Sequence, residues 1–139
     1  MGYKEHRSKI VKNLIKECDK SKISNRTLGV YIRALHICAP LNILLAFLYI
    51  SKSLYIIILI NLFIALGFFY YFNGCILTML ERDLCGDDFT FIDPFIEAYD
   101  MEMNSKNRYI VSIKVAIGYI LLCLLIFYIR FGIQIKLNF

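Results

Sequence analysis

Three long apolar segments, separated by polar stretches, divide the chain. Residues 54–72 contain no charged side chain, and residues 109–129 contain only Lys114. Residues 28–50 form a third apolar segment, with Arg33 near one end. A bilayer core about 30 Å thick needs about 20 helical residues to cross it. The pattern therefore predicts an all-α integral membrane protein with about three transmembrane helices, over 28–50, 54–72 and 109–129.

The first 27 residues are polar but carry one apolar stripe. Ile10, Val11, Leu14, Ile15 and Cys18 recur at helical spacing, and a row of basic residues covers much of the remainder. That row is Lys4, Arg7, Lys9, Lys12, Lys16 and Lys20. We predict a basic amphipathic helix in 1–27, followed by a membrane domain in 28–139. Such a helix lies in the membrane interface against anionic headgroups, or packs its stripe on a protein partner.

The loop at 81–108 is acidic and aromatic, which sets it apart from the N-terminal segment. Asp93 is a suitable N-cap and Pro94 a suitable first helical residue, so the loop predicts a short interfacial helix. If both polar segments lie on one side of the membrane, the loop acids face the basic N-terminal helix. We therefore expect ion pairs between these two segments.

Charge is distributed unevenly along the chain of 139 residues, whose formal net charge is +5. Residues 1–35 hold nine Lys or Arg, and residues 81–108 hold three more, whereas the other side of a three-span topology carries Lys52, Arg130 and Lys136. Cytosolic segments are enriched in Lys and Arg. The distribution predicts a cytosolic N-terminus and acidic loop, with the C-terminus on the opposite side. The chain is 59% hydrophobic, above the roughly 45–50% of soluble domains, which agrees with a membrane protein.

Two asparagines are predicted to lie at similar depth in the first and second spans. Asn42 is ten residues before Lys52, at the turn between the spans, and Asn61 is nine residues after it. Opposed asparagines hydrogen-bond between membrane helices. We predict an interhelical polar pair, with a polar permeation path as the alternative.

A second polar constellation lies where the second span ends. Cys75, Thr78 and Glu81 recur every three residues, which places them down one side of a helix, and His36 is expected at the same depth. In a catalytic interpretation Cys75 is the nucleophile and His36 or Glu81 carries the proton. In a structural interpretation Thr78 bonds the backbone and Glu81 marks the helix leaving the bilayer.

The sequence offers no pattern for a cofactor or a metal. The five cysteines lack CxxC spacing, and His36 and Cys38 are two residues apart, so their side chains point about 200° apart on a helix. We expect no metal, no cofactor and free thiols. Nucleic-acid binding is not expected either, because the basic segment has few aromatic residues.

The segment from Cys75 to Glu81 resembles the Cys-Pro-Leu-Thr-x-x-Glu signature of a family of small, uncharacterised bacterial multi-span membrane proteins. Ile76 stands where the family has Pro, while Leu84 corresponds to a Leu that follows the family motif. His36 matches a His common in the family's first span. The resemblance implies a multi-span helical architecture and no particular activity.

Three functional hypotheses follow. The first is a small structural or assembly protein with protein partners or self-association, such as an accessory subunit or a viral internal-membrane or envelope component. The viral version rests on the abundance of Ile, Lys, Asn, Phe and Tyr, which is typical of AT-rich genomes such as those of large DNA viruses. The second is a membrane-embedded enzyme or redox protein built on His36, Cys75 and Glu81. The third is an oligomeric pore lined by Asn42, Asn61, Asn73 and Lys114. The first is favoured, and with it a non-enzymatic role.

Overall fold

The computed structural model describes the chain from residue 3 to residue 132. All regular secondary structure within this range is helical, and the all-α prediction is confirmed. The elements in chain order are α1 (Tyr3–Cys18), α2 (Asn25–Ala46), α3 (Lys52–Tyr71), α4 (Ile76–Cys85), α5 (Asp93–Ala98), α6 (Ser105–Phe127) and the π-helical turn η1 (Tyr128–Gly132).

Three of these helices are long and apolar enough to cross a membrane: Asn25–Ala46, Lys52–Tyr71 and Ser105–Gly132. Their apolar side chains face outward rather than inward, as in a protein whose solvent is lipid; Leu41 and Leu121 are examples that are more than half exposed. The chain is therefore membrane-embedded. The first span begins and ends a few residues earlier than predicted, and the third is longer at both ends.

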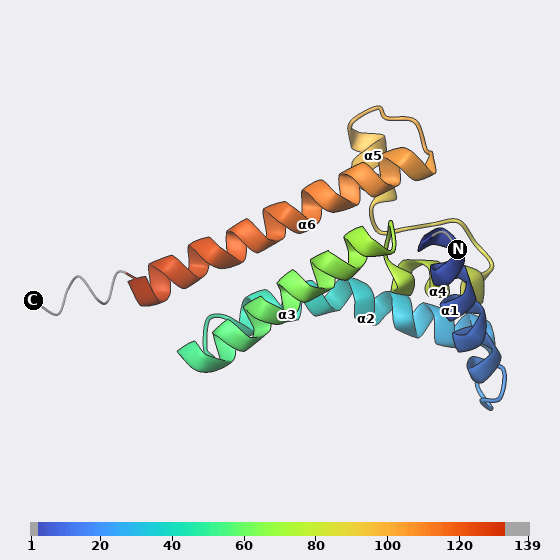
Figure 1. Ribbon diagram of the computed structural model, residues 1–139, viewed down its shortest axis with the longest axis horizontal. Coiled ribbons are helices and arrows are strands. Elements are labelled where there is room, and N and C mark those ends of the chain that lie inside the picture. Colours follow the sequence, from blue (N-terminus) through green and yellow to red (C-terminus); the bar gives the residue numbers. More distant parts are fainter. Residues whose placement is uncertain (1–2, 133–139) are drawn as a thin grey trace, which may run out of the picture.

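The molecule has two distinct ends (Figure 1). At one end α2 turns tightly into α3, and α6 finishes nearby; we call this the turn end. At the other end lie α1, α4, α5 and the beginning of α6; we call this the polar end. The arrangement places the N-terminal helix and the acidic loop together, as the three-span topology predicts.

An apolar core holds the turn end together. Phe47, Tyr55, Leu59 and Cys123 are buried there, so α2, α3 and α6 all contribute. The Tyr55 ring stacks on Phe47 at 3.7 Å between centroids, and its hydroxyl donates to the Cys123 carbonyl at 2.7 Å. Arg130, beyond α6, donates to the Phe47 carbonyl at 2.5 Å, which satisfies a carbonyl at the end of α2.

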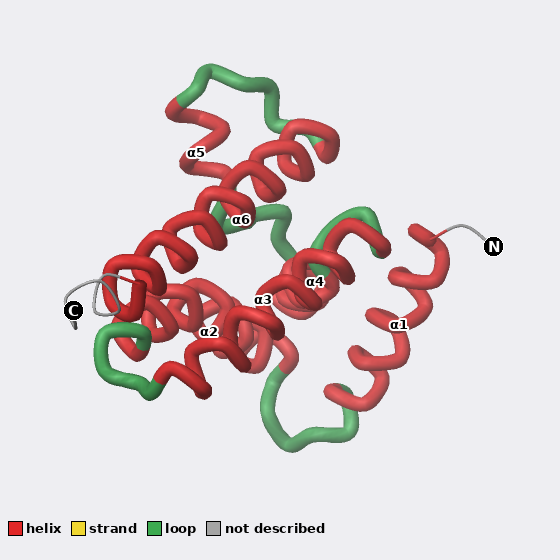
Figure 2. Tube along the Cα trace, turned by 60° about the vertical axis from the view of Figure 1, so that its left-hand side comes forward, coloured by secondary structure: helices red, strands yellow, loops and turns green. Residues whose placement is uncertain are grey.

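Two smaller apolar clusters build the polar end. Val11 of α1 packs against Leu80 and Leu84 of α4, and α4 in turn packs along the first half of α2. Figure 2 shows α1 beside α4, on the opposite side of the molecule from α5. Ile96 of α5 is buried against Val111 of α6. The apolar stripe of α1 thus packs on the chain's own fourth helix, which the sequence did not predict.

The close contact between α2 and α4 depends on a glycine. A Cβ at Gly29 would lie 2.7 Å from the Cys85 sulfur and 2.9 Å from the Leu84 Cβ, so no larger residue fits without displacement. This approach brings the side chains of α4 within reach of those on the next turns of α2, where Arg33 and His36 lie.

The predicted start of the loop helix is wrong by one residue. Asp93 is the first helical residue and not the N-cap, which is Ile92. The Asp93 carboxylate instead accepts from the Thr90 backbone N–H at 2.9 Å and from the Thr90 hydroxyl at 2.7 Å. The helix is also short, and α4 takes up the first residues of the segment that the sequence assigned to a loop.

Candidate functional site: a cysteine, histidine and glutamate cluster

A turn after the second span places Cys75 at the head of a new helix. α3 ends with Asn73 and Gly74 at positive φ, and Gly74 N–H donates to the Phe69 carbonyl while Asn73 N–H donates to that of Tyr70. These two bonds form a Schellman motif, which stops the helix and redirects the chain. Cys75 then adopts an extended conformation as the N-cap of α4. Cys75 therefore caps the helix that carries Thr78 and Glu81, rather than lying within that helix as predicted.

The thiol, the imidazole and a carboxylate lie in one continuous chain of contacts. The Cys75 sulfur is 3.7 Å from Nε2 of His36, and Nδ1 of the same ring is 3.2 Å from Oε2 of Glu81. Cys75 is the N-cap of α4, and Glu81 lies further along the same helix. His36 of α2 contacts both side chains. The structure thus joins three residues that the sequence proposed as a cluster.

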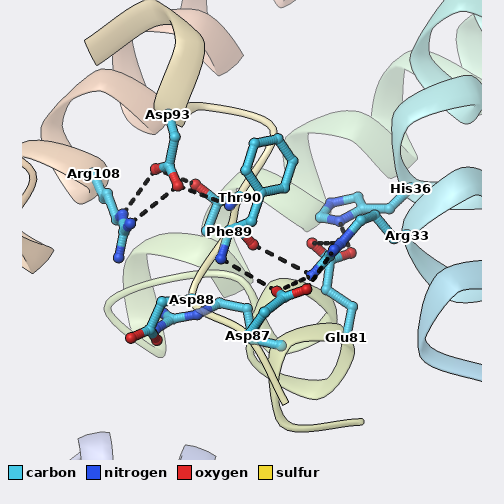
Figure 3. A network of polar contacts seen from close by, with 10 residues as sticks. Arg33, His36, Glu81, Asp87, Asp88, Phe89, Thr90, Asp93 and Arg108 are labelled. Atoms are coloured by element: carbon cyan, nitrogen blue, oxygen red, sulfur yellow. Dashed lines mark hydrogen bonds and ion pairs between the residues drawn. The ribbon is translucent and has the colours of Figure 1, made fainter. Parts of the chain in front are cut away.

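Glu81 is the most deeply buried charged side chain of the cluster, with 1% of its surface exposed. Nε of Arg33 lies 3.9 Å from its other oxygen, Oε1, so the carboxylate has one basic neighbour at each oxygen. A buried carboxylate is stable only when it is paired in this way. Figure 3 shows Arg33 and His36 converging on Glu81 from the same helix.

Arg33 links this cluster to the loop that follows α4. Its guanidinium contacts the Asp87 carboxylate in two places, at 2.6 and 3.1 Å, and lies over the Phe89 ring at 5.5 Å. The pKa of Asp87 is held below its usual value mainly by the hydrogen bonds from Arg33. The loop is therefore tied to α2, and Phe91 from the same loop meets the His36 ring edge-on at 5.5 Å between centroids.

A second ion pair fixes the loop to α6. The Asp93 carboxylate accepts from Arg108 at 2.8 and 3.0 Å, in addition to the bonds from Thr90 (Figure 3). Burial acts to raise the pKa of Asp93, but the hydrogen bonds from Arg108 and Thr90 outweigh it and lower that pKa. The acids of the loop thus pair with α2 and α6, rather than with the basic side of α1 as expected.

The environment of Cys75 favours its thiolate. Burial alone would raise the pKa of the Cys75 thiol, but hydrogen bonding with His36, the charge on that ring and hydrogen bonding to Thr78 together lower it. A position at a helix N-terminus favours the anion as well, because unpaired N–H groups point toward it. Thr78 of α4 therefore helps to lower the pKa of the thiol, and it belongs to the predicted cluster.

A cleft of about 620 Å³ reaches the thiol. Cys75 and Thr78 lie on its wall, together with the end of α3, the loop at 90–92 and the first turns of α6. The Cys75 thiol is thus reached from the polar end of the molecule.

The cluster is arranged for proton transfer rather than for metal binding. Cys75 and Glu81 meet opposite nitrogens of the His36 ring, so one ion cannot be bound by all three. Among residues 3–132 no group of three or more His, Cys, Asp or Glu side chains is placed to hold a metal.

The structure does not bring the other predicted site residues together. Asn61 donates to the carbonyl of Ile57 in its own helix at 2.8 Å, and the structure does not join it to Asn42, which is exposed. Of the basic row on α1, Lys9, Lys12, Lys16 and Lys20 are exposed, and the side chain of Lys4 lies outside the described part. Arg7 turns inward, and its guanidinium donates to the Asn73 carbonyl at 2.7 Å.

Comparison with family models, with curated proteins and with solved structures found no match to this chain. The resemblance to the Cys-Pro-Leu-Thr-x-x-Glu family stays a prediction. The function is therefore argued from the site itself.

Proposed function

We propose that the protein is a membrane-embedded thiol enzyme that transfers an acyl group from an ester to water or to another hydroxyl compound. The observation that supports it is the unbroken chain from the Cys75 sulfur through His36 to Glu81. A nucleophile, a base in contact with it and a third group that orients the base are the parts that covalent acyl transfer needs.

The three residues have separate roles in the proposed reaction. The Cys75 thiolate attacks the acyl carbonyl carbon, and a C–S bond forms as the C–O bond of the ester breaks. The proton on Nε2 of His36 moves to the departing alkoxide oxygen. In the second half, water or an alcohol gives a proton to His36 and attacks the thioester, so that a new C–O bond forms and the thiolate returns.

Two features of the surroundings favour these steps. Glu81 holds the His36 ring through Nδ1, which keeps Nε2 toward the sulfur and stabilises the imidazolium. The first N–H groups of α4 have no intrahelical partner, and they lie beside Cys75. A tetrahedral oxyanion formed at the thiol would gain their hydrogen bonds.

We also propose that the polar end faces the cytosol. The support is the Lys and Arg count, because this end carries the basic residues of 1–35 and of 81–108. A reducing compartment would keep Cys75 as a free thiol.

The structural or assembly role is the competing proposal. The observation in its favour is that the same polar contacts join α2, α4 and the loop, so the cluster contributes to folding whether or not it reacts. In this role Cys75 has no chemical function, and protein partners bind the exposed lysines of the N-terminal segment.

The test uses the full chain in lipid nanodiscs with p-nitrophenyl butyrate as the acyl donor. We expect an initial burst of p-nitrophenolate equal to the amount of protein, and intact mass spectrometry should find a butyryl adduct that hydroxylamine removes. Cys75→Ala should abolish both. His36→Asn should slow the burst by about 10²- to 10⁴-fold, as expected for loss of a general base.

The matched control is Cys38→Ser, because Cys38 is an exposed thiol two residues from His36 on the same helix. This variant should keep the full burst. Circular dichroism of each variant confirms that it is folded. Absence of an adduct in folded wild-type protein, or an adduct that persists in Cys75→Ala, contradicts the enzyme proposal.

A further inference from the structure

The cleft that reaches Cys75 has a wall rich in positive charge. Arg7 of α1, Arg82 of α4 and Lys106 and Arg108 of α6 all line it, whereas Asp83 is the one acidic residue in the lining. Four cations therefore come together from three helices that are far apart in the sequence. Such a concentration is costly unless an anion, from the protein or from a ligand, neutralises it.

Protein acids neutralise the cleft only in part. Arg108 is bound to Asp93, and a nitrogen of Arg82 bonds to Asp88. Within the described residues, Lys106 has no hydrogen-bond or ion-pair partner. Arg7 meets only the neutral carbonyl of Asn73. Two of the four cations thus have no acidic partner.

Unused donors at the cleft call for an acceptor with several oxygens. Nε of Arg7 and Nε of Arg82 are buried, and neither has a hydrogen-bond partner in the part of the chain that the structure describes. A buried donor without a partner destabilises the folded protein. A guanidinium with Nε free is suited to bidentate contact with a phosphate or carboxylate group.

Two aromatic rings form an apolar part of the cleft wall. Phe69 in the last turns of α3 and Tyr109 at the beginning of α6 stack at 5.5 Å between centroids, nearly parallel, and both line the cleft. These residues belong to the ends of two membrane-spanning helices. The cleft therefore combines charged groups with aromatic residues at the ends of two spans.

We propose that this cleft binds the phosphate group of an anionic phospholipid, between Arg7, Arg82 and Lys106, with the apolar part of the lipid along Phe69 and Tyr109. A phosphodiester carries the oxygens that the unused arginine donors need, and the acyl chains of a lipid match the aromatic residues at the ends of the spans. The inference rests on the proposed function in one respect: a bound phospholipid would be the acyl ester that Cys75 attacks. Binding itself does not depend on that reaction.

The test measures lipid retention with the full chain carrying Cys75→Ala, so that no turnover removes the ligand. Native mass spectrometry should find dioleoyl phosphatidylglycerol retained in preference to dioleoyl phosphatidylcholine. Lys106→Gln should weaken that retention by about fivefold, which corresponds to about 1 kcal/mol per basic contact. Arg7→Gln should have a similar effect.

The matched control is Lys52→Gln. Lys52 is the first residue of α3, at the turn end, so it begins an apolar span as Lys106 does but lies away from the cleft. It should leave retention unchanged. Equal retention of the two lipids, or equal effects of Lys106→Gln and Lys52→Gln, would overturn the proposal.

A second arm distinguishes lipid from a soluble phosphate compound. Glycerol 3-phosphate is added to the lipid-loaded protein, and we expect it not to displace the lipid at millimolar concentration because it lacks the apolar part. Displacement at that concentration would overturn the lipid assignment and leave a site for free phosphate esters. Since binding is read in the Cys75→Ala protein, its failure is separate from a failure of the acyl-transfer test.

Discussion

The two ends of the molecule bury polar side chains by different means. At the turn end the ring of Tyr55 is fully buried, and a single hydrogen bond to a carbonyl satisfies its hydroxyl. At the polar end the Glu81 carboxylate is buried to the same degree, but it needs charged neighbours on both oxygens. The turn end thus combines apolar packing with little electrostatic cost.

This difference separates stability from chemistry. Burying a carboxylate together with its charged partners contributes little net stability, because desolvation offsets the attraction between them. Apolar residues of similar volume at the same positions often give equal or greater stability. An ionic cluster beside a thiol is therefore better explained by the reactivity it confers. If so, removing a charge from the cluster at the polar end should cost more than removing the one hydrogen bond of Tyr55 at the turn end.

The largest effect is expected from Glu81→Ala. Removal of the carboxylate leaves His36 and Arg33 without their buried partner, and loss of one member of a buried pair costs about 3–5 kcal/mol. Partial exposure of Arg33 and its second bond to Asp87 favour the lower figure. Unfolding by sodium dodecyl sulfate in mixed micelles, followed by circular dichroism, measures it. The exposed Glu97 provides the control, and an equal effect of Glu97→Ala would contradict the pairing.

The next effect concerns the glycine that lets α2 and α4 meet. Gly29→Ala places a methyl group against Cys85 and Leu84, and overpacking of this kind costs about 1–3 kcal/mol. The same displacement moves His36 relative to Cys75, so it should also lower the burst of p-nitrophenolate from p-nitrophenyl butyrate. Gly118→Ala in α6 is the control, because nothing lies within 4 Å of its Cβ. Adding Cys85→Ala should restore part of the loss; no recovery would exclude the clash as the cause.

A third effect depends on pH through Asp93. Because the folded protein lowers the pKa of this carboxyl, the ion pair with Arg108 stabilises the fold above the usual Asp pKa of about 3.9 and is lost as pH falls through the lower folded value. Asp93→Asn should cost about 1–2 kcal/mol at pH 7. Its difference from wild type should shrink below about pH 4. Asp100→Asn, at an exposed position, should show no such dependence of unfolding free energy on pH. A difference between Asp93→Asn and wild type that stays constant with pH would contradict the ion pair of Asp93 with Arg108.

The smallest effect belongs to the turn end. Tyr55→Phe keeps the stacked ring and removes the hydroxyl that donates to the Cys123 carbonyl. A hydrogen bond between membrane helices contributes about 0.6 kcal/mol on average. The same unfolding assay measures it, with Tyr49→Phe at an exposed position as the control. A loss as large as that of Glu81→Ala would remove the contrast between the two ends.

The sequence predicted the spans because their signal is local: 54–72 is apolar throughout, and a bilayer requires that length. The sequence also identified Cys75, Glu81 and His36 as one candidate cluster, because their spacing and expected depth in the membrane place them close together. The break at Asn73 and Gly74 was missed. Its signal was an Asn-Gly pair directly after an apolar run, which is typical of a turn.

Other features could not be read from spacing. The sequence places Arg33 near one end of the first span, but it does not show that Arg33 pairs with Asp87, fifty-four residues later in the chain. Arg108 and Asp93 are likewise partners only because α5 folds back on α6. The position of α1 on α4 depends on a match between two apolar stripes, and one sequence does not show which stripe is the partner.

The most direct test of the account is the rate at which iodoacetamide alkylates Cys75 in the folded protein, measured by peptide mass spectrometry across a pH series. Because hydrogen bonding with His36 and Thr78 lowers the pKa of Cys75, its rate should reach half-maximum below the usual thiol value of about 8.5. His36→Asn should move that midpoint upward. A Cys75 midpoint at or above the usual thiol value, or one that His36→Asn leaves unchanged, would contradict the thiol–imidazole–carboxylate site.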